Sequence, residues 1–521
     1  MPDFARNSAV SFTYAPAAAL QRAMAAGEIT AEALATHYLS RIDELNPALH
    51  AVITVSPDAV ADAAASDERR ALGASRGPLD GIPVLVKDNI QVSGMPTTAG
   101  SPALLSTRAP DAFIITRLRA AGAVILGKAN LSEWANFRSA HSTSGWSTLG
   151  GQAANPYALD RNPSGSSSGS AVAVSAGLAP LAIGTETDGS IVSPSSACGI
   201  VGIKPTAGLV SRTGIVPVSP VQDTAGPMAV TVADAAALLS VLAAADPRDP
   251  AVEFPAEYPE RFHGTLDYTD FLDQGALNGA KVGIWRAGSA AANAATKAVL
   301  DAAVAQLGTL GARVTDPVEL PDAETLPEPE WKALKHEFKH GIDAYLKYLA
   351  AFGAAGDGVP GSLAELIDFN VRNSALVLSR FGQDIFEEAA ATSGDLSDPE
   401  YLELRAAATR IAVTALEAPV REHGLDAIVC LTGTPAWLID YVLGDHFIFG
   451  SSSPAAVAGW PSITVPAGYV SGLPVGISFT GPPWSEPRLI ALAYAFEQAT
   501  AVRRVPSLAR SVPAGMMAAW D

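Results

Sequence analysis

Apolar positions near the start of the chain follow helical spacing and then change to a strand pattern. The segment from Ala17 to Leu45 has apolar residues three and four positions apart, which predicts two amphipathic helices divided at Gly27. Pro47 is expected to close the second helix. The run GIPVLV at 81–86 is short, β-branched and bounded by glycine, so it predicts a buried strand that ends directly at Lys87.

Helical and strand patterns continue to alternate after this strand. They predict a helix near 111–121, a strand at 123–126 and another helix from about Leu131. Between 152 and 199 the chain is rich in Gly and Ser but keeps apolar stretches such as AVAVSAGLAPLAI, which indicates tight loops against a core rather than a linker. The alternation predicts an α/β fold whose sheet is covered by helices on both faces.

The segment 246–425 differs in character, because it is more helical, charged and aromatic. Its clearest amphipathic helix reads WKALKHEFKHGIDAYLKYLAAF, and we expect a variable helical cap here, inserted before the last strands. After it, DAIVCL, SITVPAG and PVGISFTG predict strands that complete the sheet, followed by a helix near 486–500. The whole chain, 1–521, is therefore expected to form a single domain.

Composition narrows the class of protein. The 521 residues are 48% hydrophobic and 17% charged, a balance typical of a compact globular protein. The formal net charge of −19 repels nucleic acid and anionic membranes, so neither is expected as a partner. The two cysteines, Cys198 and Cys430, cannot form a disulfide framework. The N-terminus lacks a signal-peptide pattern and no apolar run reaches about 18 residues, which predicts a cytoplasmic protein.

The densest polar signal is NPSGSSSGS at 162–170, followed by GTETDGSIVSPSSACGIVGIKPT at 184–206. Such stretches are often no more than turns and helix caps. A phosphate-binding loop would need G-x-x-x-x-G-K-[ST], which is absent here. A Ser-His-Asp hydrolase elbow would need G-x-S-x-G, whereas Ser190 lies in D-G-S-I-V. Neither chemistry is indicated.

One histidine pair has the spacing of a zinc site. His336 and His340 are four residues apart and Glu337 follows the first, so HEFKH meets the H-E-x-x-H pattern. No third ligand is evident, however, and Lys335 and Lys339 add positive charge beside the pair. No metal or cofactor is therefore expected.

A lysine at the end of an apolar strand and separate serines remain as candidates for chemistry. A lysine with an ordinary pKa of about 10.4 is almost entirely charged at pH 7 and is no base. Burial behind VLVK would lower the pKa of Lys87, and the neutral amine could then accept a proton from a serine hydroxyl. A strand-end lysine that reaches solvent explains these residues equally well, so the residues alone leave this choice open.

Four sequence blocks between Gly81 and Pro227 decide between these two interpretations of Lys87. They read, in order, GIPVLVKDNI, SGSSSGSA, GTETDGSIV and GIVGIKPT. This text resembles the amidase signature family, and LSEWANFRSAHSTSGWSTLGGQ and the stretch from Val201 to Met228 are most similar to its bacterial peptide amidases, which release ammonia from C-terminal peptide amides. The resemblance implies a large, twisted, mixed central sheet with helices on both faces, and an amidase signature core at 80–230.

The resemblance also implies a catalytic set. Lys87 matches the family lysine, Ser166 the bridging serine and Ser190 the nucleophile. Neutral Lys87 would draw a proton from Ser166, which would draw one from Ser190, and the Ser190 alkoxide would attack the amide carbonyl to form an acyl-enzyme. The family has a cis peptide before its bridging serine, which corresponds here to Gly165–Ser166.

The turn that contains the nucleophile is expected to form the oxyanion hole, from backbone N–H groups of Thr187, Asp188, Gly189 and Ser190. Asp188 stands where the family often has glycine, and its carboxylate would oppose an oxyanion if it pointed inward. We therefore expect it to point away and to fix the turn or a substrate group. Val192 replaces a frequent arginine, so support for this loop must come from elsewhere.

Other residues near these blocks receive supporting roles. Asp223 and Arg212 are expected to form a scaffold ion pair or a cap. In the family, the stretch before the bridging loop lines the acyl side of the pocket, so Ser142 and Ser144 are expected to bind substrate. Trp146 is expected to pack in the core, as tryptophan side chains commonly do.

The attached group is not fixed by these motifs. A small-molecule or peptide amide substrate is expected, with a peptide C-terminal amide favoured, while an aryl-amide, carbamate or ester would use the same three residues. A transamidation subunit of a tRNA-dependent amidotransferase is a further alternative, against which the net charge of −19 and the peptide-amidase-like text argue. The chain is expected to be a monomer or a homodimer.

Overall fold

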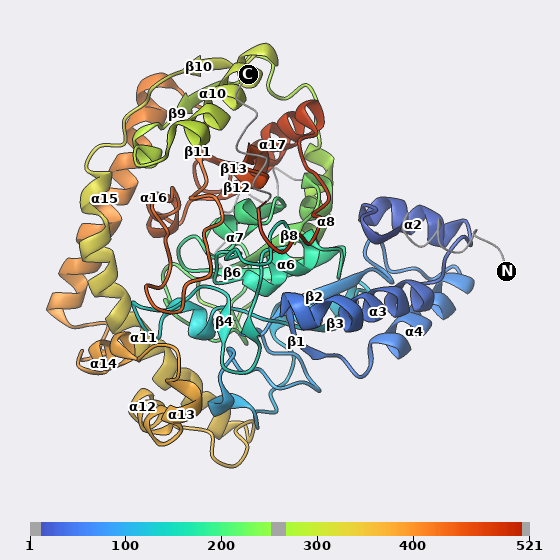
Figure 1. The fold of residues 1–521 in the computed structure, drawn as a ribbon, viewed down its shortest axis with the longest axis vertical. Helices are drawn as coiled ribbons and strands as arrows, with labels where there is room; N and C mark the ends of the chain where they lie inside the picture. Colours follow the sequence, from blue (N-terminus) through green and yellow to red (C-terminus); the bar gives the residue numbers. More distant parts are fainter. Residues whose placement is uncertain (1–11, 252–266, 513–521) are drawn as a thin grey trace.

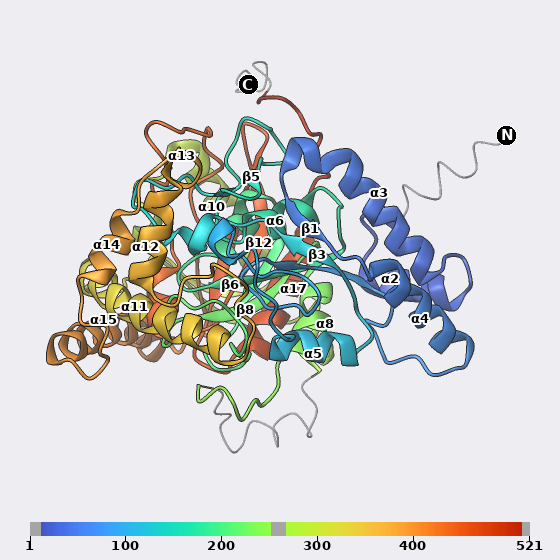
Figure 2. The ribbon, with the colours of Figure 1, turned by 90° about the horizontal axis from the view of Figure 1, so that it is seen from below.

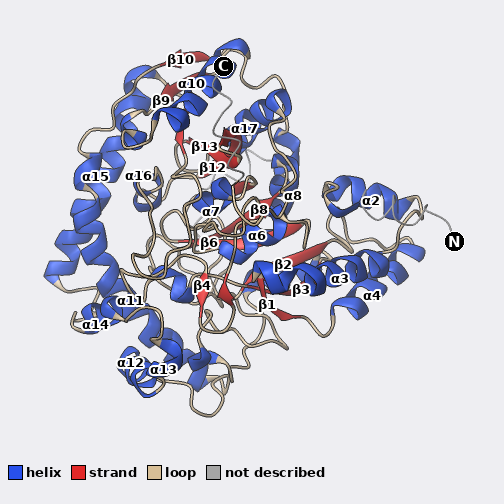
Figure 3. Ribbon diagram, in the orientation of Figure 1, coloured by secondary structure: helices blue, strands red, loops and turns tan. Residues whose placement is uncertain are grey.

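A mixed β-sheet runs through the centre of the computed structural model, which describes residues 12–251 and 267–512. Its strands are β1 Val52–Val55, β2 Pro83–Lys87, β3 Val124–Ala129, β6 Leu181–Glu186, β7 Val201–Lys204, β8 Thr224–Ala229, β9 Lys281–Ile284, β10 Arg313–Thr315, β11 Ala427–Leu431, β12 Ser462–Val470 and β13 Leu473–Thr480. Within the described residues these eleven strands follow the order β1-β3-β2-β6-β8-β7-β12-β13-β11-β9-β10 (Figures 1 and 3). The large mixed sheet predicted from the sequence is confirmed.

Helices cover both faces of this sheet. They are α2 Ala17–Ala25, α3 Ala31–Leu49, α4 Ala59–Ala71, α5 Phe113–Ala120, α6 Ser168–Ser175, α7 Val192–Ala197, α8 Val232–Leu242, α10 Ala294–Thr309, α11 Pro327–Ala351, α12 Leu363–Arg372, α13 Ser374–Val377, α14 Asp384–Ala390, α15 Pro399–His423, α16 Ser453–Val457 and α17 Glu486–Thr500. Helices α5, α8 and α17 contact one another in series, whereas α6 contacts α7 and packs on β2, β6 and β8. The sheet is thereby buried between helical layers, as expected for strands that are apolar throughout.

Strand β2 occupies the middle of the parallel part of the sheet. It runs parallel to both neighbours, with Lys87 opposite Ala129 of β3 and Val86 opposite Ile183 of β6. All five residues of β2 are buried. The remaining contacts of β6 are antiparallel, to β8. Lys87 therefore lies at the end of a strand that is covered on every side, which agrees with the buried strand predicted at 81–86.

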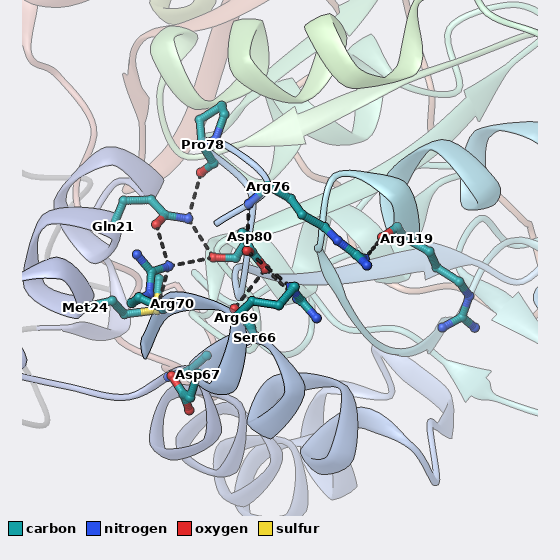
Figure 4. Close-up of polar contacts among 11 residues, drawn as sticks. Gln21, Met24, Ser66, Asp67, Arg69, Arg70, Arg76, Pro78, Asp80 and Arg119 are labelled. Carbon is teal, nitrogen blue, oxygen red and sulfur yellow. Dashed lines mark hydrogen bonds and ion pairs between the residues drawn. The ribbon is translucent and has the colours of Figure 1, made fainter. Parts of the chain in front are cut away.

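A polar cluster fixes the start of this strand (Figure 4). The carboxylate of Asp80 accepts hydrogen bonds from Ser66 Oγ at 2.9 Å, Arg69 Nη2 at 2.5 Å and the backbone N–H of Arg76 at 2.9 Å. Gln21 of α2 donates its amide to the backbone carbonyl of Asp80 at 2.8 Å. Helices α2 and α4 are thus joined to the segment that leads into β2.

Two helix predictions need correction. The division of the first two helices at Gly27 is confirmed, since α2 ends at Ala25 and α3 begins at Ala31. Helix α3 does not close at Pro47, because it continues to Leu49. The helix expected from about Leu131 is wrong: this stretch forms only the 3₁₀ turn Glu133–Asn136, whose residues 134–136 have positive φ. A left-handed backbone cannot continue an α-helix.

The segment expected to be a helical cap, 246–425, contains both sheet and lobe. Residues 252–266 lie outside the described residues. Strands β9 and β10 extend the central sheet, with β9 parallel to β11. Helices α11 to α15 form a lobe on the opposite side of the molecule from α2, α3 and α4 (Figures 1 and 2). The helical lobe itself is confined to the second part, from Pro327 to His423, whereas α10 precedes it and packs on the sheet.

The two cysteines are buried free thiols. Burial raises the pKa of Cys198, and it raises that of Cys430 to about 11. In the described part of the chain, no helix is both long and apolar enough to span a membrane.

Candidate active site

Lys87 is the centre of a buried hydrogen-bond cluster. Its Nζ lies 2.8 Å from Ser166 Oγ, 2.8 Å from Thr185 Oγ1 and 3.1 Å from the Thr185 carbonyl oxygen. Asn89 donates its side-chain N–H to Thr185 Oγ1 at 2.9 Å, so this hydroxyl serves as an acceptor. A neutral amine has two N–H groups and one lone pair. The two oxygens of Thr185 can take the N–H groups, which leaves the lone pair for Ser166.

The electrostatic environment of Lys87 favours this neutral form. Burial lowers the pKa of Lys87 to about 7, although the negative charges of Glu186 and Asp223 act in the opposite direction. No carboxylate in the described residues forms an ion pair with it. The adjacent buried lysine differs, since Lys128 Nζ lies 3.0 Å from a carboxylate oxygen of Asp88. Lys87 thus has the properties of a base that works near neutral pH.

Ser166 begins a tight loop at the start of α6. The peptide bond Gly165–Ser166 is cis, as predicted. The backbone N–H of Ser167 donates to the carbonyl of Ser190 at 3.1 Å, which ties this loop to the turn of the predicted nucleophile. Among the described residues, no hydrogen bond directly joins the Ser166 and Ser190 hydroxyls. The two serines are therefore held side by side through their backbones.

The turn 187–190 connects β6 to α7 and has an open backbone. The N–H groups of Asp188, Gly189 and Ser190 donate to no acceptor in the described part of the chain. Gly189 has φ of +77°, and a Cβ atom there would approach Ser452 Oγ to 2.9 Å. A larger residue would thus be strained at this position. Three consecutive free donors are available beside the hydroxyl of Ser190.

Glu186 supplies the support that Val192 does not. One oxygen of its buried carboxylate accepts from the backbone N–H groups of Ile191 at 2.7 Å and Val192 at 3.0 Å. A carboxylate at the first N–H groups of α7 satisfies donors that a helix end leaves unpaired. The start of α7 is therefore anchored by an acidic residue from the preceding strand.

Asp188 contacts the start of α16. Its carboxylate accepts from Ser453 Oγ at 2.6 Å, at the start of α16. Thr187 is fixed separately, because its hydroxyl donates to Asp223 at 2.5 Å. Asp223 also accepts from the backbone N–H groups of Val218 and Ser219. Side chains on both sides thus anchor the turn.

Arg212 and Asp223 do not form the scaffold ion pair that was one of two expectations. Arg212 instead pairs with Asp249 at 2.7 Å. Asp223 acts as a cap for the loop at 218–219 and for Thr187. Burial raises the pKa of Asp223 to about 6.

A cavity of about 960 Å³ opens over Ser190. It is lined by the turn 187–190, by the first turns of α11 and by residues 437–453. Ser144 lines it and accepts a hydrogen bond from Asn136 at 3.0 Å, whereas Ser142 lies outside its lining. A smaller cavity of about 220 Å³ is lined by Ser166 and Thr185. The structure thus brings one of the two predicted substrate serines to the cavity.

Gln222 joins the turn to the helical lobe. Its buried side-chain N–H₂ group donates to the Thr187 carbonyl at 3.3 Å and to Glu330 of α11 at 2.9 Å. Its oxygen accepts from Arg405 of α15 at 2.8 Å. This amide therefore connects two lobe helices to the turn 187–190.

The HEFKH motif belongs to the same network. Glu337 accepts from Arg405 at 2.7 Å, from Tyr401 at 2.9 Å and from Ser219 at 2.5 Å. His340 contacts the carbonyl of Gly394. Among the described residues, no group of three or more His, Cys, Asp or Glu side chains is placed to hold a metal ion. Glu337 is engaged in packing the lobe.

Comparison with known proteins places the chain in a family. A model of the amidase family matches residues 33–490. The chain is a member of the amidase family. It is 42% identical to a probable amidase of Arabidopsis thaliana over 92% of this chain and 88% of that protein. Among solved structures, the peptide amidase of Stenotrophomonas maltophilia is 47% identical and superposes with a TM-score of 0.88 over 95% of this chain and 98% of the other.

The amidase family also contains transamidation enzymes. A glutamyl-tRNA(Gln) amidotransferase component of Symbiobacterium thermophilum is 36% identical to this amidase over 93% of this chain and 96% of that protein. The identity to the Stenotrophomonas peptide amidase is higher. These similarities, together with the fold, make the chain an amide-hydrolysing enzyme of the amidase signature type.

Several site residues were absent from the sequence predictions. Thr185 and Glu186 lie within the block GTETDGS, so the signal was present, but the side chains that contact Lys87 and α7 could not be identified from their order. Asn89 follows the predicted lysine by two residues. Gln222 gave no signal of its own, because its partners Glu330 and Arg405 are distant in sequence.

Proposed function

We propose that this amidase releases ammonia from the C-terminal amide of peptides, through an acyl-enzyme formed on Ser190. The observation that carries the proposal is the 2.8 Å contact between Ser166 and a buried Lys87 whose pKa is about 7. Such a lysine can accept a proton at neutral pH without a histidine or a metal ion. The cavity of about 960 Å³ over Ser190 gives a peptide access to it.

The first step would activate Ser190. The lone pair of neutral Lys87 accepts the proton of Ser166, and Ser166 accepts that of Ser190. The Ser190 oxygen forms a bond to the amide carbon, and the electron pair of the carbonyl moves onto its oxygen. The backbone hydrogen bond from the N–H of Ser167 to the carbonyl of Ser190 holds the two serine loops together, which supports this relay.

The negative oxygen would be stabilised by the turn. The free N–H groups of Asp188, Gly189 and Ser190, next to Thr187, suit an oxyanion hole. Removing one donor of this kind typically costs roughly 3–4 kcal/mol in the barrier. The contact of Asp188 with Ser453 keeps its carboxylate from this position.

The remaining steps would release ammonia and then the acid. The proton on Lys87 returns through Ser166 to the leaving nitrogen as the carbon–nitrogen bond breaks, so the nitrogen leaves as neutral ammonia. A water molecule, deprotonated by the same relay, attacks the Ser190 ester, and the carboxylic acid is released with Ser190 regenerated. Each proton is thereby returned within one cycle.

Peptide C-terminal amides are proposed over other substrates on two grounds. The high similarity to a peptide amidase favours a peptide. The cavity is at the upper end of the 300–1,000 Å³ range that is common for small-molecule sites, so it suits a chain longer than one amino acid. We also propose that the chain acts as a hydrolase without an amidotransferase complex, as a monomer or homodimer.

A substrate panel tests this proposal. Purified protein is incubated with N-acetylated dipeptide amides, aliphatic amides, anilides, carbamates and esters, and ammonia and the other products are quantified. The expected result is the highest kcat/KM on peptide amides with equimolar ammonia. A higher kcat/KM on anilides, carbamates or esters would overturn the peptide assignment, and ammonia release from glutamine only in the presence of partner subunits would favour transamidation.

A further inference from the structure

The segment 437–450 exposes apolar side chains beside the cavity. Exposed apolar residues in it are Leu438, Tyr441, Val442, Leu443, Phe447 and Ile448. Phe447 and Ile448 are 46% and 65% exposed and yet line the cavity over Ser190. Exposed apolar surface next to a binding cavity is typical of a recognition site.

A further aromatic side chain from the helical lobe lines the same cavity. Trp331, in the first turns of α11, is 38% exposed and lines the same cavity. Its ring packs against Phe137, with ring centres 5.3 Å apart. We define Trp331, Phe447 and Ile448 as the apolar rim. It faces a ligand from two elements that are more than 100 residues apart in sequence.

This segment is held rigidly despite its exposure. The carboxylate of Asp445 accepts from the backbone N–H of Ser144, from Asn162 and from the indole N–H of Trp437. The Thr434 hydroxyl accepts hydrogen bonds from the backbone N–H groups of Ile448 and Phe449. The Asp445 charge is thereby satisfied inside the molecule, so the rim offers apolar contact rather than charge.

The position of the rim identifies its occupant. If the carbonyl of the amidated residue lies at Ser190, the residues before it extend from the buried part of the lining, where Ser164 and Ser190 lie, toward its exposed residues. The exposed residues of the lining are the apolar rim together with Pro327, Glu328 and Lys332. A net charge of −19 disfavours an anionic lipid surface as the occupant.

We infer that the apolar rim binds apolar side chains of the residues that precede the amidated residue, so that this amidase prefers peptide amides with an apolar penultimate region. The inference rests on the proposed function. Its energetic basis is the removal of apolar surface on both the peptide and the rim from water. Serine at the same peptide position would lose this contribution.

The test compares matched peptides. N-acetylated tripeptide amides that end in alaninamide carry either leucine or serine at the two preceding positions, and kcat and KM are determined from ammonia release. For the natural chain we expect kcat/KM about tenfold higher for the leucine peptide, mainly through KM, a discrimination usual for small apolar groups. The variants Phe447→Ser and Ile448→Ser should each reduce this ratio to below about threefold.

The control variant is Leu72→Ser, because Leu72 is also strongly exposed but lines neither cavity. It should keep the tenfold ratio, and thermal unfolding should be the same for all variants. Equal kcat/KM for the two peptides in the natural chain would overturn the inference and leave the proposed function standing. Absence of ammonia from both peptides would overturn the proposed function itself. A ratio unchanged in both rim variants, with a change in molar mass by light scattering, would overturn the inference and assign the rim to self-association.

Discussion

Two regions of this amidase bury ionisable groups, and they do so in opposite ways. At the end of β2, Lys87 is fully buried without an ion-pair partner among the described residues, and its pKa falls to about 7. In the lobe of α11 to α15, Glu337 is equally buried but is bound by Arg405, Tyr401 and Ser219. Only the first arrangement leaves a group free to exchange protons.

This difference explains why two sequence motifs that both suggested a functional site have different roles in the structure. VLVK ends an apolar strand, and HEFKH has the spacing of a metal site. A buried charge that is paired and fully hydrogen-bonded serves the scaffold, whereas one that is desolvated without a direct counter-charge serves chemistry. The partners of a group, rather than its residue type, decide between these roles.

The largest expected effect is at the nucleophile. Ser190→Ala should lower kcat by roughly 10⁴-fold or more, because no other oxygen can form the acyl-enzyme. Ammonia release from a peptide amide measures this, and circular dichroism checks the fold. Ser93→Ala, a change at an exposed serine, is the control. Activity of Ser190→Ala within tenfold of the natural chain would refute the assignment.

The matching change in the lobe should affect stability. Glu337→Ala leaves Arg405 buried without its partner, and loss of one member of a buried pair costs about 3–5 kcal/mol in the free energy of unfolding. Urea denaturation measures it. Glu328→Ala, at an exposed glutamate of the same helix, should leave the free energy of unfolding nearly unchanged.

Because Glu337 is engaged by three protein donors, chelators should leave activity unchanged; inhibition by a chelator would instead favour the metal interpretation of HEFKH.

The pH profile tests the state of Lys87. In the proposed mechanism the neutral amine is the base, so kcat/KM should fall about tenfold for each pH unit below an inflection near pH 7 and level off above it. The negative charge of Asp223 raises the pKa of Lys87, so Asp223→Asn should move the inflection to lower pH. An inflection that moves upward, or a flat profile between pH 5 and 8, would contradict this role.

Gln222, which links the two regions, is expected to have a smaller effect on activity. Gln222→Ala removes the donor to the Thr187 carbonyl and the acceptor of Arg405. We expect kcat to fall about tenfold with KM nearly unchanged, a smaller effect than the roughly 10²–10³ that follows loss of an oxyanion donor itself. Steady-state kinetics separate the two parameters. A rise in KM at unchanged kcat would assign Gln222 to substrate binding instead.

The smallest effect concerns the two predicted substrate serines. Ser144 lines the cavity and Ser142 does not, so Ser144→Ala should raise KM about threefold, the contribution of one modest hydrogen bond. Ser142→Ala is its matched control and should keep the natural KM. Equal effects of both variants would show that the region acts through its backbone.

Lys87, Ser166 and Ser190 could largely be predicted from the sequence, whereas the residues that surround them could not. The apolar run before Lys87 indicates a buried strand end, and the ordered blocks around Ser166 and Ser190 identify the serine loops. The turn at Trp134–Asn136 was missed because its left-handed backbone is set by tertiary contacts, including the hydrogen bond from the N–H of Trp134 to Ala99. Trp331 and Phe447 line the same cavity although they are more than 100 residues apart in sequence, so their order in the chain does not indicate it.

The burial of Cys198 and Cys430 allows selective labelling of the exposed segment 437–450, beside the apolar rim. Thiols with raised pKa values inside the core react slowly with maleimides, since the thiolate is the reactive form. A cysteine introduced at Val442, which is 89% exposed, would therefore take a fluorescent dye without removal of the native thiols. Emission from that dye would report the arrival of a peptide in real time, before any ammonia is produced.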